Sequence, residues 1–465
     1  MLTDAGIDVL IFDAGNGRTQ ATNYLALCRV FRHVRDGGGM TPQIAFMANP
    51  DVVREVHFEF YSQDLYPELW FRWLGKPLIL STSADPDTYE EPYRSFFTIR
   101  RCWDSTYGKD AWSWIAWHPQ GHGWHETEGE VEQMSASFAR HPTASVGRSY
   151  SNGKQPPIDR DALTGLEHLG IYFDEQMSRV HEMDPKFPLI CQWNEWTAGR
   201  HVSAEAHGEG MFGRPAQPGG TYFVDEYNME FSRDAEPMKG GFGDSYYHQL
   251  TSAVRRFKGV RAPDPVSPPQ EIAIDGRFGE WADVKPEYRD HIGDTQHRLA
   301  QGYARGLFYT NTTGRNDLVA MKVARDDSNV YFYARTEHDL TPATDPNWML
   351  LFIDGGQDPQ TGWHGYDYLV NRHVADATTT SLERTGAGWE WESLSRDISH
   401  AVSGNELELS VPRDMLGEDG PDVSIDFHWA DNIEGKSDIA EFALHGDSAP
   451  SRRFNHRYGS PDAGT

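Results

Sequence analysis

A proline-rich stretch divides this sequence into two parts that differ in kind. Residues 260–270 read VRAPDPVSPPQ, with four prolines and little apolar content, which is typical of an extended linker. A chain of 465 residues is also too long for one compact core. We therefore expect a first domain over residues 1–259, a linker over 260–270 and a second domain over 271–465.

Before the linker, short apolar runs alternate with helical stretches. IDVLIF (7–12) precedes a helix that glycines end, and PQIAFMANP (42–50) precedes a helix that we expect Asp51 to cap. Further strand candidates lie at 76–81, 96–101, 132–139, 187–193 and 220–227, and further helices at 160–183 and 244–258.

This alternation predicts a parallel sheet covered on both faces. About seven such units in succession favour a (β/α)8 barrel of the triosephosphate-isomerase (TIM) type over an open, doubly wound sheet. No G-x-G-x-x-G follows the first strand, so a nucleotide site has no support.

After the linker the pattern changes to strands with period-two alternation. ARDDSNVYFYA predicts a hairpin that turns at residues 326–329, and ELELSVP and VSIDFHWADN are typical strands. The whole chain is thus expected to be multidomain, with an α/β barrel followed by an all-β domain, a β-sandwich.

Acidic side chains stand at several of the predicted strand ends. In a parallel barrel the functional groups gather at the carboxyl ends of the strands. The acids at those ends are Asp13, Glu195, Asp225 and Glu226. Cleavage of a glycosidic bond needs two carboxylates, so we expect Glu195 as base or nucleophile and one of the other three as the second group.

Aromatic and polar residues surround Glu195 in the segment QWNEWTAG (192–199). Indole faces suit the apolar side of a sugar ring, and amide, imidazole and guanidinium groups suit its hydroxyls. The expected sugar contacts of the barrel are Trp193, Asn194, Trp196, Tyr227, Trp124, His141 and Arg148. The alternative is that the tryptophans belong to the core and Glu195 pairs with an arginine. His118, His122 and His125 lack a zinc-site pattern, so no metal is expected in the barrel.

The segment QWNEWTAG resembles the WNEW-type signature of glycoside hydrolase family 99 and its relatives, which include family 71 and the bacterial WbsX-like proteins. AGIDVLIFDAGNG and RDGGGMTPQIAFM are similar to the early strands of those barrels. In that family the signature glutamate is held to activate the sugar 2-hydroxyl, a role that the resemblance gives to Glu195. A second glutamate three residues on acts as acid and base there, whereas this chain has Ala198, so the acid comes from elsewhere or the chain is not catalytic.

Barrels of that group carry a strand and a helix before the AGID-type segment. The resemblance therefore implies an N-terminal truncation that removed strand one and any leader. No leader is visible in this chain, but on that expectation the protein is secreted or periplasmic.

The second domain resembles the carbohydrate-binding module family 9-like sandwich in the phrases IAIDGRFGEWADV, NWMLLFIDGG and TGWHGYDYLVNR. In that family aromatic residues clamp a sugar, a part that Trp348, Trp363 and Tyr366 match loosely. The resemblance also implies a structural calcium ion, for which Asp354, Asp358 and Asp367 offer oxygen ligands. No cofactor is expected to be required for catalysis.

The charge of the chain limits its partners. A formal net charge of −28 argues against nucleic acid and anionic lipid, and no apolar run is long enough to cross a membrane. We expect a glycosidase that acts on a poly- or oligosaccharide. The alternatives are a non-catalytic carbohydrate-binding protein and a polysaccharide lyase, whose anionic substrate an acidic protein disfavours. The sequence does not indicate an oligomeric state.

Overall fold

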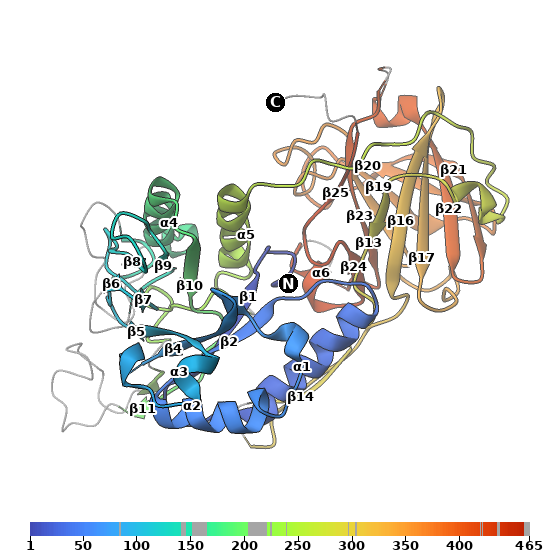
Figure 1. Cartoon of the computed structure of the whole chain (residues 1–465). Coiled ribbons are helices and arrows are strands. Elements are labelled where there is room, and N and C mark those ends of the chain that lie inside the picture. The colour runs from blue at the N-terminus through green and yellow to red at the C-terminus, as the bar shows by residue number, and fades with distance from the viewer. Residues whose placement is uncertain are drawn as a thin grey trace. The chain divides into compact units, whose positions relative to one another are not determined.

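The computed structural model describes residues 1–82, 85–140, 146–150, 165–202, 221–223, 226–238, 240–295, 297–302, 305–418, 420, 422–434 and 438–459. The chain forms two compact units, Met1–Val260 and Arg261–Thr465, which are treated separately below (Figure 1). The proline-rich stretch that was predicted as a linker begins at the boundary between them.

A mainly parallel sheet forms the first half of the N-terminal unit. Its strands are, in order, β1 (Val9–Ala14), β2 (Gln43–Ala48), β4 (Lys76–Ser81), β5 (Thr98–Trp103) and β7 (Ala111–Ser113), with β3 (Arg72–Trp73) antiparallel to β4. The helices of this half are α1 (Ala21–Asp36), α2 (Pro50–Val56) and α3 (Tyr93–Phe96). The α2 helix is capped by Asn49, whose side chain accepts from the amides of Asp51 and Val52, so the predicted cap at Asp51 is wrong by two residues.

A second sheet completes the N-terminal unit. It contains β10 (Phe187–Cys191), β9 (Gln133–Ser137), β8 (Gly123–Trp124) and β6 (Gly108–Lys109), in that order. The α4 helix (Ile171–Met183) and the α5 helix (Ser245–Lys258) pack on it, and both lie beside β10 in Figure 1. Two short strands, β11 (His201–Val202) and β12 (Thr221–Tyr222), pair with each other.

The predicted TIM barrel is wrong. Within the described residues the two sheets do not join, and helices do not follow the strands regularly. Between β5 and β9 the chain makes only the short strands β6, β7 and β8 with no helix, because residues 104–131 hold turns, glycines and prolines instead of a helix-length amphipathic stretch. Of the predicted strand at 220–227, the described residues form β12, which is antiparallel to β11 and joins neither sheet.

The two sheets nevertheless share one apolar core. Leu78 and Leu80 of β4 pack in one cluster with Leu189 and Cys191 of β10 and with Trp112 of β7. The strand residues on the opposite faces pack against helices, since Ile190 of β10 joins the cluster formed by α4 and α5. Strands β4 and β10 are therefore covered on both faces, as expected for strands buried between layers, whereas β9 turns the buried polar residues Gln133, Ser135 and Ser137 to one face.

The C-terminal unit is built on one antiparallel sheet. In order, its strands are β13 (Glu287–Arg289), β16 (Leu318–Arg325), β17 (Asn329–Thr336), β22 (Glu406–Pro412), β21 (Glu392–Ser403), β20 (Thr379–Arg384), β19 (Tyr368–Val374), β18 (Leu350–Asp354), β23 (Ile425–Asp431) and β24 (Asp447–Ala449), and β25 (His456–Tyr458) pairs with β23. A separate hairpin of β14 (His297–Gln301) and β15 (Phe308–Thr312) and the short helix α6 (Glu441–Leu444) complete the unit.

This sheet corrects the predicted β-sandwich. Instead of two packed sheets, a single sheet curls around its core, because Val323 of β16, Leu382 of β20, Leu409 of β22 and Phe427 of β23 belong to one buried cluster. The hairpin predicted at residues 326–329 is confirmed by the pairing of β16 with β17.

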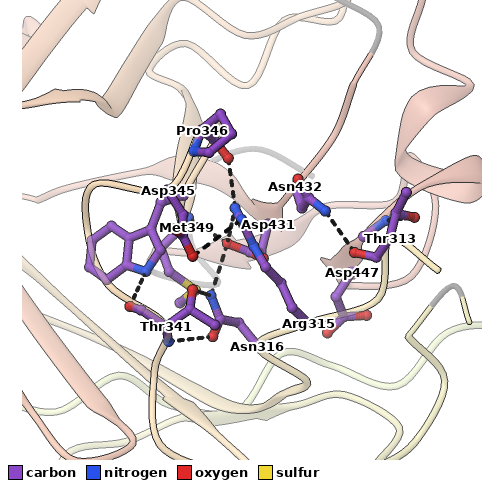
Figure 2. Close-up of polar contacts among 12 residues, drawn as sticks. Thr313, Arg315, Asn316, Thr341, Asp345, Pro346, Met349, Asp431, Asn432 and Asp447 are labelled. Atoms are coloured by element: carbon purple, nitrogen blue, oxygen red, sulfur yellow. Dashed lines mark hydrogen bonds and ion pairs between the residues drawn. The ribbon is translucent and has the colours of Figure 1, made fainter.

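A buried ion pair holds one end of this core (Figure 2). Arg315 donates to the Asp431 carboxylate at 2.6 Å, and Asp431 also accepts from the Asn316 amide group and the Met349 backbone amide. The Asp431 side chain is fully buried. With these donors in place, the carboxylate is stabilised without contact to water.

Candidate functional site

Glu195 lies in the loop that follows β10. The apolar strand Phe187–Cys191 ends in the core, and the next residues turn toward the segment 230–236. The Glu195 side chain is half-buried, and the Gln192 side-chain amide donates a hydrogen bond to it. The Glu195 backbone amide in turn donates to Asp234 at 2.8 Å, which fixes the position of the loop.

The surroundings of Glu195 favour its protonated form. Burial raises the pKa of Glu195 to about 7, and the negative charges of Asp13 and Asp234 add to this effect, while the Arg233 guanidinium opposes it. At neutral pH this carboxyl is therefore poised between its acid and its base form, which is the state required of a general acid or base.

Asp13 is the second carboxyl of the site. It is the fifth residue of β1, and its side chain accepts from the Gly15 amide at 2.7 Å. Protein surrounds Asp13 on most sides, but the residue keeps an exposed surface. Burial raises its pKa, whereas the Gly15 hydrogen bond and Arg233 lower it.

Asp13 and Glu195 line the same cavity, which has a volume of about 420 Å³. Trp114, Gln192 and Trp193 border the cavity near the two acids, and the remaining lining is largely apolar. Two carboxyls beside an apolar cavity are partly removed from water, which shifts their pKa values. The cavity still leaves them open to a ligand.

The segment 230–236 contacts the residues of this site and holds them in place. Arg233 is buried, with its guanidinium 5.0 Å from the centre of the Trp114 ring, and it lowers the pKa of both Asp13 and Glu195. Glu226 and Asp234 interact directly, and burial together with the Asp234 charge raises the pKa of Glu226. We infer that Glu226 keeps its proton at neutral pH and donates it toward the buried oxygen of Asp234.

Of the predicted catalytic acids, Asp13 and Glu195 are brought to one cavity. Glu226 lies near Asp234, its Oε1 accepts from the Ser232 hydroxyl at 2.7 Å, and it is not among the residues that line the cavity. Asp225 lies outside the described residues.

The predicted sugar-contact residues are dispersed. Trp193 lines the cavity and packs edge-on against Tyr247, and the Trp196 indole donates to Glu236 at 2.6 Å. Asn194 is exposed and Trp124 is half-buried in β8, whereas Tyr227 is buried. His141 lies outside the described residues.

Arg148, which was expected to contact a sugar, forms hydrogen bonds inside the protein. It is buried, donates to the backbone and hydroxyl oxygens of Ser232 and to the Asp234 carbonyl, and lies over the Tyr246 ring. With its donors used inside the protein, Arg148 positions the segment 230–236 and is closed to a ligand.

The three aromatic residues expected to clamp a sugar in the C-terminal unit lie in its core. Trp348, Trp363 and Tyr366 are almost fully buried, and each belongs to a core cluster of the curled sheet. The Trp348 indole donates to the Thr341 carbonyl at 2.8 Å. Rings that are packed on both faces offer no surface for stacking on a sugar.

The predicted calcium ligands serve as turn acceptors. Asp354 accepts from the Gly356 and Asp358 amides, Asp358 from the Gln360 amide, and Asp367 from the Gly355 amide. Among the described residues, the carboxylates that come within 4.8 Å of one another as possible ligands are those of Asp290, Asp294 and Asp447. The fold thus gathers different acids from those that the sequence suggested.

Sequence reasoning missed Gln192, Trp114 and the pair Arg233–Asp234. The run EFSRDAEPM was interpreted as a loop with its own internal ion pairs, because its charges alternate in sign. In the structure its contacts are long-range, to Trp114, Arg148 and Glu195. The local sequence offered no signal of these contacts, because a run of charges that alternate in sign is also typical of a solvated loop.

Comparison of the chain with family models, with curated proteins and with solved structures gives no match. A search of the described residues finds no helix with the length and apolar character that a membrane span requires.

Proposed function

We propose that the N-terminal unit is a glycoside hydrolase in which Glu195 is the proton donor and Asp13 is the second carboxylate. The observation that supports this proposal is the location of both carboxyls on one cavity, with the pKa of Glu195 raised to about 7. Two carboxyls with different proton affinities are the minimum apparatus for hydrolysis of a glycosidic bond.

The electrostatics change the roles expected from the sequence. A carboxyl with a pKa near 7 is a poor nucleophile at acidic to neutral pH, because much of it is protonated, but it is a competent acid. Burial also raises the pKa of Asp13, but the Gly15 amide and Arg233 oppose that rise, and Asp13 is more exposed than Glu195, so Asp13 is the better candidate for the ionised group. Glu195 is therefore assigned the role of acid instead of base.

The proposed reaction begins with transfer of one proton from Glu195 to the leaving group. The Glu195 carboxyl gives its proton to the glycosidic oxygen while the bond from that oxygen to the anomeric carbon breaks, and the leaving group departs as a neutral alcohol. The Asp13 carboxylate either bonds to the anomeric carbon or takes a proton from the water that does so. In the first case, the Glu195 carboxylate then removes a proton from the water that releases the sugar.

The cavity favours a sugar with an apolar face or an apolar aglycone. Trp114 and Trp193 border the acids, and indole rings stack on the C–H face of a pyranose. The loop 192–196 is tied to the segment 230–236 through hydrogen bonds from Ala235 to Gln192 and from Glu236 to Trp193, so this wall of the site is held in place.

The experiment is a screen of the full chain against a panel of polysaccharides and oligosaccharides, with release of reducing ends as the readout. Glu195→Gln and Asp13→Asn are expected to lower the rate at least a hundredfold on any glycan that the wild type cleaves. Asp51→Asn, at a highly exposed carboxylate of α2, is the control and is expected to keep wild-type activity. A glycan that binds without cleavage would favour the alternative, a non-catalytic carbohydrate-binding protein.

A further inference from the structure

Two strands of the N-terminal unit are the last strands of their sheets, and both line the same cavity. β1 is the last strand of the first sheet and pairs only with β2, and β10 is the last strand of the second sheet and pairs only with β9, within the part of the chain that the structure describes. Each strand therefore presents one edge of backbone amides and carbonyls that no described strand uses.

The cavity of about 420 Å³ runs along both of these edges. Its lining includes residues 8–11 and 13 from the β1 segment and residues 186–192 from the β10 segment. At one end of the cavity lie Asp13, near the end of β1, and Glu195, which follows β10. At the other end lie Asp8 and Lys186, each of which directly precedes one of the two strands. The two strands therefore run in the same direction along the cavity.

The remaining walls of the cavity are apolar on two opposite sides. On one side, Leu250, Val254 and Phe257 of α5 and Met177 of α4 line it; on the other, Leu80 and Met47 reach it from the core shared by the sheets. The side chains of β1 alternate between the shared core, where Val9 and Ile11 pack, and the cluster around α1, where Leu10 and Phe12 pack.

These features specify the chemistry of a ligand. Unpaired backbone edges on two sides require donors and acceptors at the spacing of a β-ladder, and apolar walls on the other two sides require apolar groups that point in alternate directions. Away from the acid end of the cavity the hydroxyls of a sugar chain would face the apolar walls, so a sugar is expected only beside Asp13 and Glu195. An extended peptide with apolar side chains on both faces matches all four sides.

We propose that the gap between β1 and β10 binds an extended segment of another polypeptide as an added parallel strand. The segment needs the length of its neighbours, which are six residues in β1 and five in β10. It is rich in Val, Ile and Leu, and it lies between the two acids and the opposite end of the cavity at Asp8 and Lys186. This proposal does not depend on the proposed hydrolase activity, because it uses the strand edges and α5 instead of the carboxyls.

The test uses the full chain and a capped, dye-labelled peptide with a core of alternating Val and Ile and a lysine at each end. A second peptide of the same sequence carries N-methyl groups on alternate core amides, which removes the donors on one edge. Fluorescence anisotropy is expected to show saturable binding of the first peptide and at least tenfold weaker binding of the second. Hydrogen exchange is expected to slow at least tenfold at amides in both Val9–Ala14 and Phe187–Cys191 when the first peptide binds.

Two variants of α5 locate the binding site. Val254→Trp fills the cavity from the helix side and is expected to abolish peptide binding, whereas Ser252→Trp, at an exposed position of the same helix outside the lining, is expected to leave it unchanged. If Val254→Trp does not fold, the exchange protection in the wild-type chain decides the question.

Three results would overturn the proposal. They are no saturable binding of the peptide, equal binding of the N-methylated peptide, and protection confined to one of the two strands. Binding of a small apolar dye that the peptide fails to displace would also overturn it, since the cavity would then take a small molecule. Loss of glycan hydrolysis in the carboxyl variants has no bearing on any of these readouts.

Discussion

The backbone amide of Glu195 donates a hydrogen bond of 2.8 Å to the Asp234 carboxylate. Two further backbone hydrogen bonds, from Ala235 to Gln192 and from Glu236 to Trp193, join the same two segments. The loop that carries the candidate acid is therefore fixed by a segment nearly forty residues away, and the position of Glu195 depends on that segment as much as on β10.

Asp234→Ala is expected to destabilise the N-terminal unit by about 2 kcal/mol, because it leaves the Glu195 amide without its acceptor and Glu226 without its neighbouring carboxylate. Urea denaturation of the variant measures this loss. Asp87→Asn, at an exposed carboxylate, is the control and is expected to change the free energy of unfolding by less than about 0.5 kcal/mol. Equal stability of the two variants would contradict the role given to Asp234.

Glu195→Gln is expected to stabilise the N-terminal unit at pH 8 and to have little effect at pH 4.5. The folded chain holds the Glu195 proton up to about pH 7, whereas an unperturbed glutamate releases it near pH 4.5. The folded state therefore binds more protons between these values, so wild-type stability falls as pH rises through this window and stays lowered above it.

The gain expected for Glu195→Gln at pH 8 is on the order of 1–2 kcal/mol, reduced from the full linkage value because the side chain is partly exposed. Urea denaturation of wild type and variant at both pH values measures it. A difference between the two proteins that does not change with pH would show that Glu195 titrates normally.

Glu132→Gln is expected to destabilise the N-terminal unit by about 3 kcal/mol, since it leaves the buried Arg100 guanidinium with only the more exposed Asp110 carboxylate, at 3.3 Å, as a counter-charge. Arg100 bonds both Glu132 oxygens, at 2.7 and 2.8 Å, and the indoles of Trp73 and Trp112 donate to the same carboxylate. Burial raises the pKa of Glu132, but these donors outweigh it and lower the pKa overall. The stabilisation is thus present above the pKa of an unfolded glutamate and is lost as pH falls through the lower, folded value.

The matched control for this prediction is Glu130→Gln, two residues away. Glu130 pairs with Lys186 at the surface, where both side chains are 59% exposed, so its loss is expected to cost less than about 0.5 kcal/mol. Similar denaturation midpoints for the two variants would contradict the account of the buried pair.

Asp431→Asn is expected to destabilise the C-terminal unit by about 3 kcal/mol or more, because Arg315 loses its buried partner (Figure 2). Asp345→Asn removes the second and more exposed carboxylate near Arg315, at 3.6 Å, and is expected to cost less than about 1 kcal/mol. Thermal unfolding of the two variants gives the comparison. A smaller effect at Asp431 than at Asp345 would be inconsistent with the burial of the first.

Local sequence signals predicted individual elements well. KPLILS is β4 over Lys76–Ser81, the helix expected at 244–258 is α5 over Ser245–Lys258, and the turn at 326–329 joins β16 to β17. In each case the signal lies in neighbouring residues: an unbroken apolar run, an amphipathic period, or a cluster of Asp, Ser and Asn.

The arrangement of these elements could not be predicted from the sequence. Whether parallel strands close into a ring depends on which edges meet, and no local pattern in β1 or β10 records that each ends its sheet. The aromatic residues of the C-terminal unit show the same limit: Trp348 and Trp363 suit either a sugar platform or a core, and the curled sheet places them in the core. Asp13 and Glu195 were predicted because both are acids close to the end of a strand, whereas Asp234 stands in a loop with only long-range contacts.

The most direct test of the account is the dependence of activity on the leaving group. On aryl glycosides of a sugar that the wild type cleaves, Glu195→Gln is expected to lose at least a hundredfold in kcat/KM when the leaving group is a poor one such as phenol. It is expected to lose less than tenfold with dinitrophenol, which departs without a proton. Asp13→Asn is expected to lose activity equally on both substrates. An equal loss on both substrates for Glu195→Gln, or wild-type activity in that variant, would contradict the assignment of Glu195 as the acid.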